Sequence, residues 1–477
     1  MLLPSLTAVA EPVPASRLGR VHFTGIGGAG MSGVARIMLA RGIPVSGSDA
    51  RPSPLLEELR ALGADIQVGH ASGNLGALGA GDTLVYTSAV SADNPEVAEA
   101  ARRGMRVVHR AEALASVMAG RRVIAVAGTH GKTTTTGMLT TVFRECGADP
   151  GYAIGGILTA TGLGAEDGTG PDFIAEADES DGSFLLLSPD VAVITNVEAD
   201  HLNYYASLAD VEAAFAAFGQ RVGGTVLTCA DDRGAEAVAG RLDPARVRRY
   251  GVSPHADYRL TEVRSRGMAL SFTVTADHGP FGRILTPVTV DVPGQHNALN
   301  AAAAFAAAVE LGLTPARVAA AIAGYRGARR RLELKGEAHG VRVLDSYAHH
   351  PTELAADLRA ARDIAEGKGR VIAIFQPHLF SRTRIFAREF GAALGLADEA
   401  IVLDVYAARE DPEPGVTGRL VADAVPGGRA RFEPDPGHVA ALVGALAEPG
   451  DLVLTMGAGD ITALGPRLVR ALGGPRE

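Results

Sequence analysis

The feature that most constrains this chain is a glycine-rich turn that follows a short apolar strand. The predicted strand covers residues 123–126, and the turn over residues 128–134 reads Gly-Thr-His-Gly-Lys-Thr-Thr before a predicted helix. Backbone N–H groups in such a turn bind phosphate oxygens, the lysine adds positive charge, and the Thr133 hydroxyl can reach Mg²⁺. The turn departs from the general phosphate-loop pattern, whose first glycine would fall at Val126. An ordinary glycine turn is the alternative, but Lys132 is one of only three lysines in the chain.

Two acidic clusters follow predicted strands further along the chain. The strand at residues 173–177 carries Glu176 and leads to Asp178, which we expect on the same strand face because side chains alternate with a period of two. The strand at residues 191–195 leads to a second cluster that ends at His201. Either cluster alone could be a solvated acidic loop. Two clusters after buried-type strands, downstream of a phosphate loop, favour a magnesium site.

A second glycine-rich turn lies near the N-terminus. Gly25, Gly27 and Gly30 follow a strand at residues 21–23, and Asp49 lies nineteen residues after the last glycine. This spacing is typical of a site that binds a diphosphate at a helix N-terminus and a ribose at the acid. UDP satisfies this description as well as NAD does, so a nicotinamide-dependent dehydrogenase is one alternative.

Strands and helices alternate along the whole chain, which predicts an α/β fold with parallel sheets. The 477 residues correspond to about three domains at roughly 150 residues each. We predict a Rossmann-like N-terminal domain at residues 1–118, a P-loop-type central ATPase domain at 119–326 and a Rossmann-like C-terminal domain at 327–477. An alanine-rich helix over residues 298–311, capped by Gln295 or Asn297, is expected in the central domain.

The net charge, the number of cysteines and the length of the apolar runs argue against several classes of function. The net charge of −9 argues against nucleic acid or an anionic membrane as a partner. Cys146 and Cys229 are too few for a disulfide framework or a thiolate metal site. The longest apolar run, residues 301–309, is too short to span a bilayer, and residues 1–19 lack the basic stretch of a signal peptide. We expect a cytoplasmic protein without membrane insertion, and the sequence leaves monomer and dimer open.

Eight motifs between about residue 21 and residue 461 resemble those of the Mur ligase family, in the family's order. They read HFTGIGGAGMSGVA, GTHGKTTTT, EADESDGSF, ITNVEADHLNYY, PGQHNALNAAAA, LDSYAHHPTEL, QPHLFSRTR and MGAGDI. The family's loop form G-T-x-G-K-T explains the missing first glycine. The resemblance implies an ATP-dependent ligase of peptidoglycan precursor synthesis. Its expected reaction joins L-alanine to the carboxylate of UDP-N-acetylmuramate through an acyl phosphate, and the M-S-G continuation of the first motif favours alanine over a peptide.

The resemblance also implies roles for individual residues. The residues expected at the UDP end of the substrate are Gly25, Gly27, Gly28, Gly30, Ser48, Asp49 and His70. Those expected around ATP are Gly128, Thr129, His130, Gly131, Lys132, Thr133, Thr134, His296, Asn297 and Asn300. Two magnesium ions would be approached by Thr133, Glu176 and His201. Arg330 or Arg331 would face a phosphate or the muramyl carboxylate, Tyr347, His349 and Arg382 the amino acid, and Asp460 the nucleotide-facing end of the third domain.

Catalysis is expected to rest on five of these residues: Lys132, Glu176, His201, His349 and Arg382. Two positions depart from the family's pattern, because Ser346 stands where many relatives carry a second acid and Leu379 where some carry arginine. Both lie near the expected amino-acid site, so the choice of amino acid is the least constrained part of the prediction. A ligase that adds a whole peptide, an NAD-dependent dehydrogenase and a nucleotide-binding regulatory protein without turnover are the alternatives.

Overall fold

The computed structural model describes residues 12–473, apart from residues 92, 203, 278–279, 368 and 409. The prediction that no signal peptide is present rests partly on residues 1–11, which lie outside the described residues. The chain divides into two compact units. One unit comprises Met1–Leu260, Val274–Thr286 and Asn300–Gly324, and the other comprises Thr261–Thr273, Pro287–Leu299 and Tyr325–Glu477. The predicted boundaries of the three domains stay predictions.

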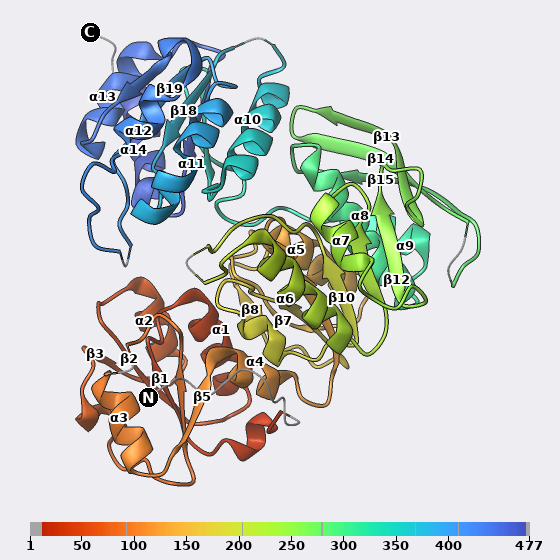
Figure 1. The fold of residues 1–477 in the computed structure, drawn as a ribbon, viewed down its shortest axis with the longest axis vertical. Helices are drawn as coiled ribbons and strands as arrows, with labels where there is room; N and C mark the ends of the chain where they lie inside the picture. Colours follow the sequence, from red (N-terminus) through yellow and green to blue (C-terminus); the bar gives the residue numbers. More distant parts are fainter. Residues whose placement is uncertain are drawn as a thin grey trace. The chain divides into compact units, whose positions relative to one another are not determined.

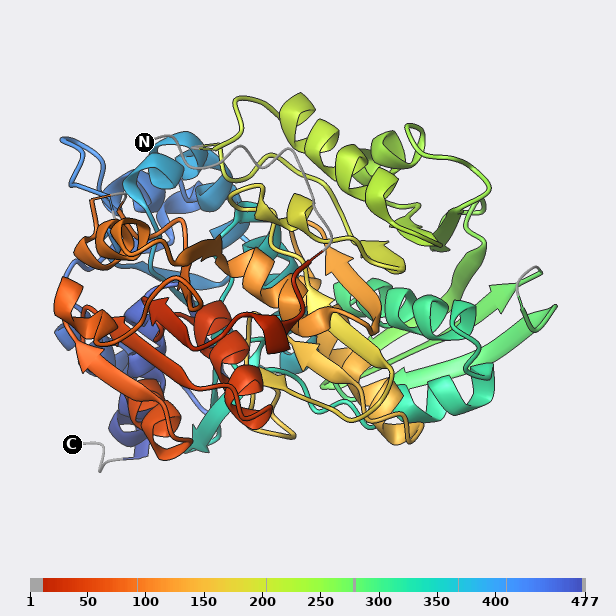
Figure 2. The same ribbon diagram turned by 90° about the horizontal axis from the view of Figure 1, so that it is seen from below.

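The N-terminal part of the first unit is built on a five-stranded parallel sheet (Figure 1 and Figure 2). Its strands are β1 (Val21–Thr24), β2 (Val45–Asp49), β3 (Asp65–Val68), β4 (Thr83–Tyr86) and β5 (Arg106–His109), in the order β3-β2-β1-β4-β5. Its helices are α1 (Ala29–Ala40), α2 (Pro54–Ala61), α3 (Pro95–Arg102) and α4 (Arg110–Met118). The strand order reverses beside β1, and ligands of open α/β sheets bind at the carboxyl ends of the strands at such a point.

The central sheet has ten strands in the order β15-β14-β13-β12-β11-β10-β6-β9-β7-β8. The strands are β6 (Arg122–Ala127), β7 (Gly151–Ala153), β8 (Ala165–Glu166), β9 (Asp172–Glu176), β10 (Val191–Ile194), β11 (Val226–Cys229), β12 (Val247–Gly251), β13 (Tyr258–Arg266), β14 (Ala269–Ala276) and β15 (Ile284–Val290). The helices of this part of the chain are α5 (Lys132–Glu145), α6 (Leu208–Arg221), α7 (Arg233–Ala239), α8 (His296–Glu310) and α9 (Pro315–Ile322). The loops that follow β6, β9 and β10, three neighbouring parallel strands, carry the predicted phosphate loop and both acidic clusters.

One local prediction in this part of the chain is wrong. Strand β9 ends at Glu176, so Asp178 lies in the loop beyond the strand and shares no strand face with Glu176. Of the two caps expected for the alanine-rich helix, Gln295 directly precedes α8, and Asn297 lies inside its first turn. The Asn297 side chain donates to the backbone oxygen of Pro293 over 2.7 Å.

The third sheet has six strands in the order β16-β17-β21-β18-β19-β20, of which only β16 and β17 pair in antiparallel fashion. The elements here are β16 (Glu333–Ala338), β17 (Val341–Ser346), α10 (Pro351–Ala365), β18 (Val371–Phe375), α11 (Phe380–Leu394), β19 (Glu399–Val402), α12 (Arg419–Asp423), β20 (Ala430–Phe432), α13 (Pro436–Leu446), β21 (Leu452–Met456) and α14 (Leu464–Gly473). Successive residues of β18 enter two separate apolar clusters, with Phe375 in one and Ile374 in the other. The sheet therefore has an apolar core on each face, as in a doubly wound domain.

Among the described residues, no helix combines the length and the apolar character needed to cross a bilayer.

Candidate active site

The predicted phosphate loop connects β6 to the N-terminus of α5. Gly128 and Gly131 have φ angles of 137° and 82°, in the region where a side chain would be strained. Gly131 is the N-cap of α5, and no described side chain caps this helix, so the N–H groups of its first turn are directed toward the loop. The backbone of the loop therefore has the form that binds a phosphate group.

Lys132 closes this loop and joins it to the first acidic cluster. Its Nζ donates to the backbone oxygens of Gly128 and Thr129 over 2.6 and 3.2 Å, and to Oε1 of Glu179 over 2.8 Å. Burial works to lower the pKa of Lys132, but the carboxylates of Glu179, Glu176 and Asp178 outweigh it and raise the pKa. Lys132 is therefore a cation at neutral pH.

Glu179 is the most deeply buried acid of the site, with 2% of its side chain exposed. Burial raises its pKa to about 7, although Lys132 works against that shift. Within the described part of the chain, its buried Oε2 has no hydrogen-bond partner. Such an atom is costly unless a proton or a cation is close to it.

The predicted metal ligands fall into two groups around Lys132. Thr133 donates its hydroxyl to Oε2 of Glu176 over 3.0 Å, and the backbone N–H of Gly155 donates to the same oxygen over 2.8 Å. The Nε2 atom of His201 lies 3.7 Å from Oε1 of Glu179. The structure thus brings Thr133 and Glu176 together, and places His201 beside Glu179.

The loop that follows β9 is also contacted by the N-terminal part of the chain. Arg110, the first residue of α4, donates to Asp178 over 3.1 Å. Burial works to raise the pKa of Asp178, but Arg110 and Lys132 outweigh it and lower the pKa. Asp181 lies 3.5 Å from Nε2 of His109 and accepts a 2.7 Å hydrogen bond from Ser88. The anionic charge of this loop is therefore balanced partly by residues that precede the central sheet.

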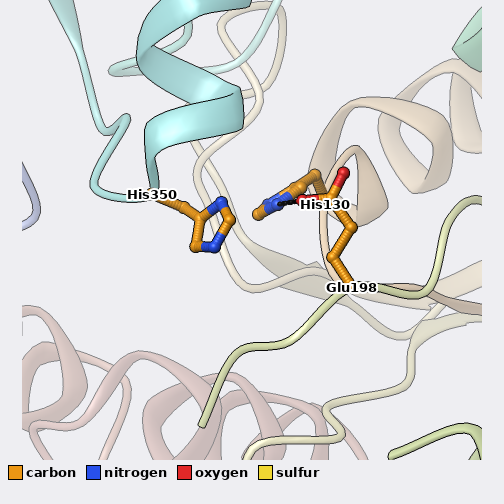
Figure 3. Close-up of side chains that lie close together, drawn as sticks. All are labelled: His130, Glu198 and His350. Atoms are coloured by element: carbon orange, nitrogen blue, oxygen red, sulfur yellow. Dashed lines mark ion pairs between the residues drawn. The ribbon is translucent and has the colours of Figure 1, made fainter. Parts of the chain in front are cut away.

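The remaining residues of the predicted ATP site in the first unit lie close to the loop. The backbone N–H of His130 donates to Oδ1 of Asn196 over 2.8 Å, and the His130 ring forms an ion pair with Glu198 at 3.7 Å when protonated (Figure 3). Asn300 accepts from the Thr135 hydroxyl over 3.3 Å, and its Oδ1 occupies the space where a side chain on Gly131 would project. The asparagine on α8 therefore packs against the phosphate loop at Gly131.

The predicted UDP site is organised around two acids. Asp49 accepts from the backbone N–H of Gly27 over 2.9 Å and so holds the N-terminal glycine turn. Glu96 is fully buried and accepts from the hydroxyl of Ser48 over 2.6 Å, and Ser48 in turn lies 2.8 Å from Nδ1 of His70. The sequence analysis found Ser48, Asp49 and His70 but did not identify Glu96.

The second unit contains the residues predicted to bind the amino acid. The guanidinium groups of Arg330 and Arg331 lie 4.9 and 5.5 Å from the ring centre of Tyr347, within reach of a cation–π interaction. His349 pairs with Glu353 at 3.2 Å. The other predicted residues of this unit are Arg382, which is buried on α11, and Asp460, which accepts from Gln376 over 2.9 Å.

His296 lies beside an acid that the sequence analysis did not identify. Its Nε2 is 3.9 Å from Asp357 on α10, and Asp357 accepts a short hydrogen bond from the hydroxyl of Ser346. Burial lowers the pKa of His296 to about 4 and raises that of Asp357 to about 7. The N-cap of α10 is His350, which is also drawn in Figure 3. A carboxyl group thus lies next to Ser346, the position at which the family's second acid is missing.

Comparison with known proteins identifies the class to which this fold and site belong. Residues 20–122 match the catalytic domain of the Mur ligase family, residues 126–308 match the Mur ligase middle domain, and residues 330–459 match the Mur ligase glutamate ligase domain. The chain therefore belongs to the Mur ligase family. The predictions of this family, of a ligase and of a fold with three α/β domains are confirmed.

The relatives point to one branch of the family. The chain is 56% identical to the UDP-N-acetylmuramate–L-alanine ligase of Kineococcus radiotolerans over 96% of its own length and 97% of the relative's. The UDP-N-acetylmuramate–alanine ligase of Thermotoga maritima has a similar crystal structure, with a TM-score of 0.80 at 30% identity over 94% of this chain and 98% of that one. A murein peptide ligase of Psychrobacter arcticus follows with a TM-score of 0.70 at 25% identity, over 96% of this chain and 100% of that one.

Proposed function

We propose that this protein joins L-alanine to the carboxylate of UDP-N-acetylmuramate and converts ATP to ADP and phosphate. The observation that carries the proposal is the contact set of Lys132, which bonds to the phosphate loop and to Glu179 while His201 lies beside the same acid. Such a set suits a reaction in which a phosphoryl group passes between two anions. The named relatives supply the identity of the substrates.

The residues around Lys132 fit a divalent cation. Carboxylate and hydroxyl oxygens are the ligands that Mg²⁺ prefers, and the buried Oε2 of Glu179 is an atom that a cation would stabilise. We assign Mg²⁺ to Thr133, Glu176 and His201, with Glu179 as an additional acid. When bound, the ion would neutralise negative charge on the phosphate groups of ATP.

The chain's own groups account for the first half of the reaction. The N–H groups of the loop and of the first turn of α5 would bind the phosphate oxygens of ATP, with Asn300 holding the loop in position. The ammonium of Lys132 would stabilise the γ-phosphoryl group while a carboxylate oxygen of UDP-N-acetylmuramate attacks its phosphorus. The P–O bond to ADP breaks in this step, and the carboxylate becomes an acyl phosphate.

The second half of the reaction requires an amine and the exclusion of water. The amine of L-alanine attacks the acyl carbon, and the tetrahedral intermediate expels phosphate to leave an amide. We assign the recognition of alanine to Tyr347, His349 and Arg382. The UDP end would be held by the N-terminal glycine turn together with Ser48, Asp49 and His70, while Arg330 or Arg331 would face a phosphate or the muramyl carboxylate. His296 and Asn297 are assigned to the adenosine side, and Asp460 supports that end of the C-terminal domain.

One alternative is supported by a specific observation. The likeness to the murein peptide ligase favours a reaction with the same UDP-linked carboxylate but with a peptide as the amine. A dehydrogenase would leave Lys132 and Glu179 without a role.

The test is phosphate release from ATP-Mg²⁺ and UDP-N-acetylmuramate with each candidate amine. We expect release that depends on L-alanine and gives a product with one new amide bond. Release with a tripeptide and not with alanine would favour the peptide ligase, and release independent of any amine would contradict both.

A further inference from the structure

Glu96 is a buried charge in the N-terminal part of the chain, at the carboxyl ends of β1 and β2. It lies in the first turn of α3, and none of its surface is exposed. Its Oε2 accepts from the hydroxyls of Thr24 and Ser48 over 2.8 and 2.6 Å, and lies 3.3 Å from Nε2 of His22. Its Oε1 accepts from Nδ2 of Asn74 over 2.7 Å and from the backbone N–H of Ala71 over 3.3 Å.

These donors keep Glu96 ionised. Burial works to raise its pKa, but the hydrogen bonds from His22, Ser48 and other donors outweigh burial and lower the pKa to about 2. A buried carboxylate costs several kcal/mol unless its hydrogen bonds are complete, and an apolar residue is often no worse for stability at such a position. Stability alone therefore gives little reason for an anion here.

The anion determines the direction of the hydrogen bonds toward His70. A carboxylate can only accept, so the single hydroxyl proton of Ser48 is donated to Glu96. The oxygen of Ser48 must then accept from Nδ1 of His70, which lies 2.8 Å away. Nδ1 is therefore a protonated nitrogen, and Nε2 is left for a ligand on a side chain that is 24% exposed.

The same residues adjoin the glycine turn. The backbone N–H groups of Gly25 and Ile26 donate to the backbone oxygen of Ser48 over 2.8 and 3.0 Å. A nucleotide whose diphosphate lies on this turn would bring its nucleoside to the carboxyl ends of β2 and β3, where His70 lies.

We propose that Glu96 is a positioning residue for the nucleoside end of the UDP-linked substrate. It acts through Ser48, and it presents Nε2 of His70 as the acceptor for a ribose hydroxyl or the imide N–H of uracil. This inference rests on the proposed function, because it takes UDP-N-acetylmuramate as the ligand of the N-terminal site.

The test is a double-mutant cycle with Glu96→Gln and Ser48→Ala, read as the KM for each substrate. In the wild-type background we expect E96Q to raise the KM for UDP-N-acetylmuramate about 10- to 100-fold and to leave the KM for ATP within about twofold. In the S48A background we expect a smaller rise, because the hydrogen-bonded path through Ser48 is interrupted and only the direct 3.8 Å approach of Nδ1 of His70 to Oε2 of Glu96 remains. An equal rise in both backgrounds, or no rise in either, would overturn the proposal.

Asp82→Asn is the matched control. Asp82 is a buried acid of the same sheet, bonded to Arg20 over 2.7 Å, and its pKa is also lowered to about 2. It does not contact Ser48 or His70 within the described part of the chain, so D82N should lower the thermal midpoint and leave the KM unchanged. A rise in KM equal to that of E96Q would assign the effect to domain stability and overturn the proposal.

A second measurement, on wild-type protein, tests the proposal even if the E96Q protein does not fold. Wild-type protein labelled with ¹⁵N-histidine should show His70 protonated on Nδ1, and a ring protonated on Nε2 alone would overturn the proposal. Failure of the proposed function is recognised separately, because wild-type protein would then not turn over UDP-N-acetylmuramate at all.

Discussion

At the scale of single residues, we expect the reaction to depend most on Lys132. Its ammonium is the cation that bonds to the phosphate loop and to Glu179. Replacing Lys132 by alanine removes a preorganised charge from the transferring phosphoryl group, and losing one such contact costs about 10² to 10³ in rate. We expect a loss in kcat of at least that size, measured by phosphate release.

Lys335 supplies the matched control for this change. It lies on β16, in the other compact unit of the chain, and pairs with Glu333 at 2.8 Å. The K335A protein should keep its activity within about threefold. A K132A protein as active as K335A would contradict the assignment of the phosphate loop.

Asp357 gives the C-terminal part of the chain a pH-dependent stability. Its pKa rises from 3.8 to about 7 on burial, so the folded chain holds this proton more tightly than the unfolded chain does. The stabilisation is complete below about pH 3.8 and is lost as the pH rises through about 7. It contributes at most about 4 kcal/mol to the free energy of unfolding. Asp357→Asn removes this titration, so the thermal midpoint of wild type should fall relative to that of D357N between pH 5 and pH 8.

Asp363→Asn, on the same helix, is the control and should follow the wild-type pH profile. Parallel profiles for wild type and D357N would show that Asp357 is ionised in the folded chain over this range, contrary to our expectation.

The residues that could be predicted from the sequence are those whose partners are local in the chain. Gly128, Lys132 and Thr133 belong to one turn, so their spacing alone indicates phosphate chemistry. Glu96 and Asp357 could not be assigned in this way, because their importance comes from partners brought to them by the fold. The partners of Glu96, for example, lie on β1, on β2 and in the loop after β3. The sequence signal available for Glu96 was one charged residue in the otherwise apolar first turn of its helix.

At the scale of elements, the conformation of the phosphate loop makes a prediction about Gly131. Its φ angle of 82° is strained for any other residue, and an added Cβ would overlap Oδ1 of Asn300. Such strain costs about 1–3 kcal/mol before the overlap is counted. We expect Gly131→Ala to raise the KM for ATP about tenfold or more while the circular dichroism spectrum stays that of wild type.

Gly147, just after the other end of α5, is a control that separates the effect of backbone strain from that of steric overlap. Its φ angle is 77°, and an added Cβ would meet no atom within 4 Å. The G147A protein should lose thermal stability and keep its KM for ATP. If G131A and G147A had the same KM for ATP, the contact between the loop and Asn300 would have no part in nucleotide binding.

The buried parallel strands were the elements best predicted from the sequence. Strand β6 was predicted at residues 123–126 and runs over Arg122–Ala127, and it could be found because a parallel strand covered on both faces is an unbroken apolar run. Strands β13 and β14 were not predicted, since their side chains alternate between buried and partly exposed positions and include many polar residues.

At the scale of the whole molecule, we expect the three sheets to carry the separate sites of a ligase. The N-terminal sheet presents a nucleotide turn, the central sheet a phosphate loop with two acidic clusters, and the third a group of histidine, arginine and tyrosine side chains. No single one of these sites distinguishes a ligase from other nucleotide-binding proteins. Their order in one chain, together with the relatives that share it over nearly their full length, identifies the class.

The central claim is that a carboxylate oxygen of the substrate is transferred to phosphate by way of an acyl phosphate. It is tested most directly with UDP-N-acetylmuramate whose carboxylate carries ¹⁸O at both oxygens, incubated with ATP-Mg²⁺ and L-alanine. Attack on the γ-phosphorus forms a bridging ¹⁸O bond, and attack by the amine then releases that oxygen with phosphate. We predict one ¹⁸O atom in each phosphate formed, seen by mass spectrometry or by the isotope shift in ³¹P NMR. Amide product formed together with unlabelled phosphate would contradict the account.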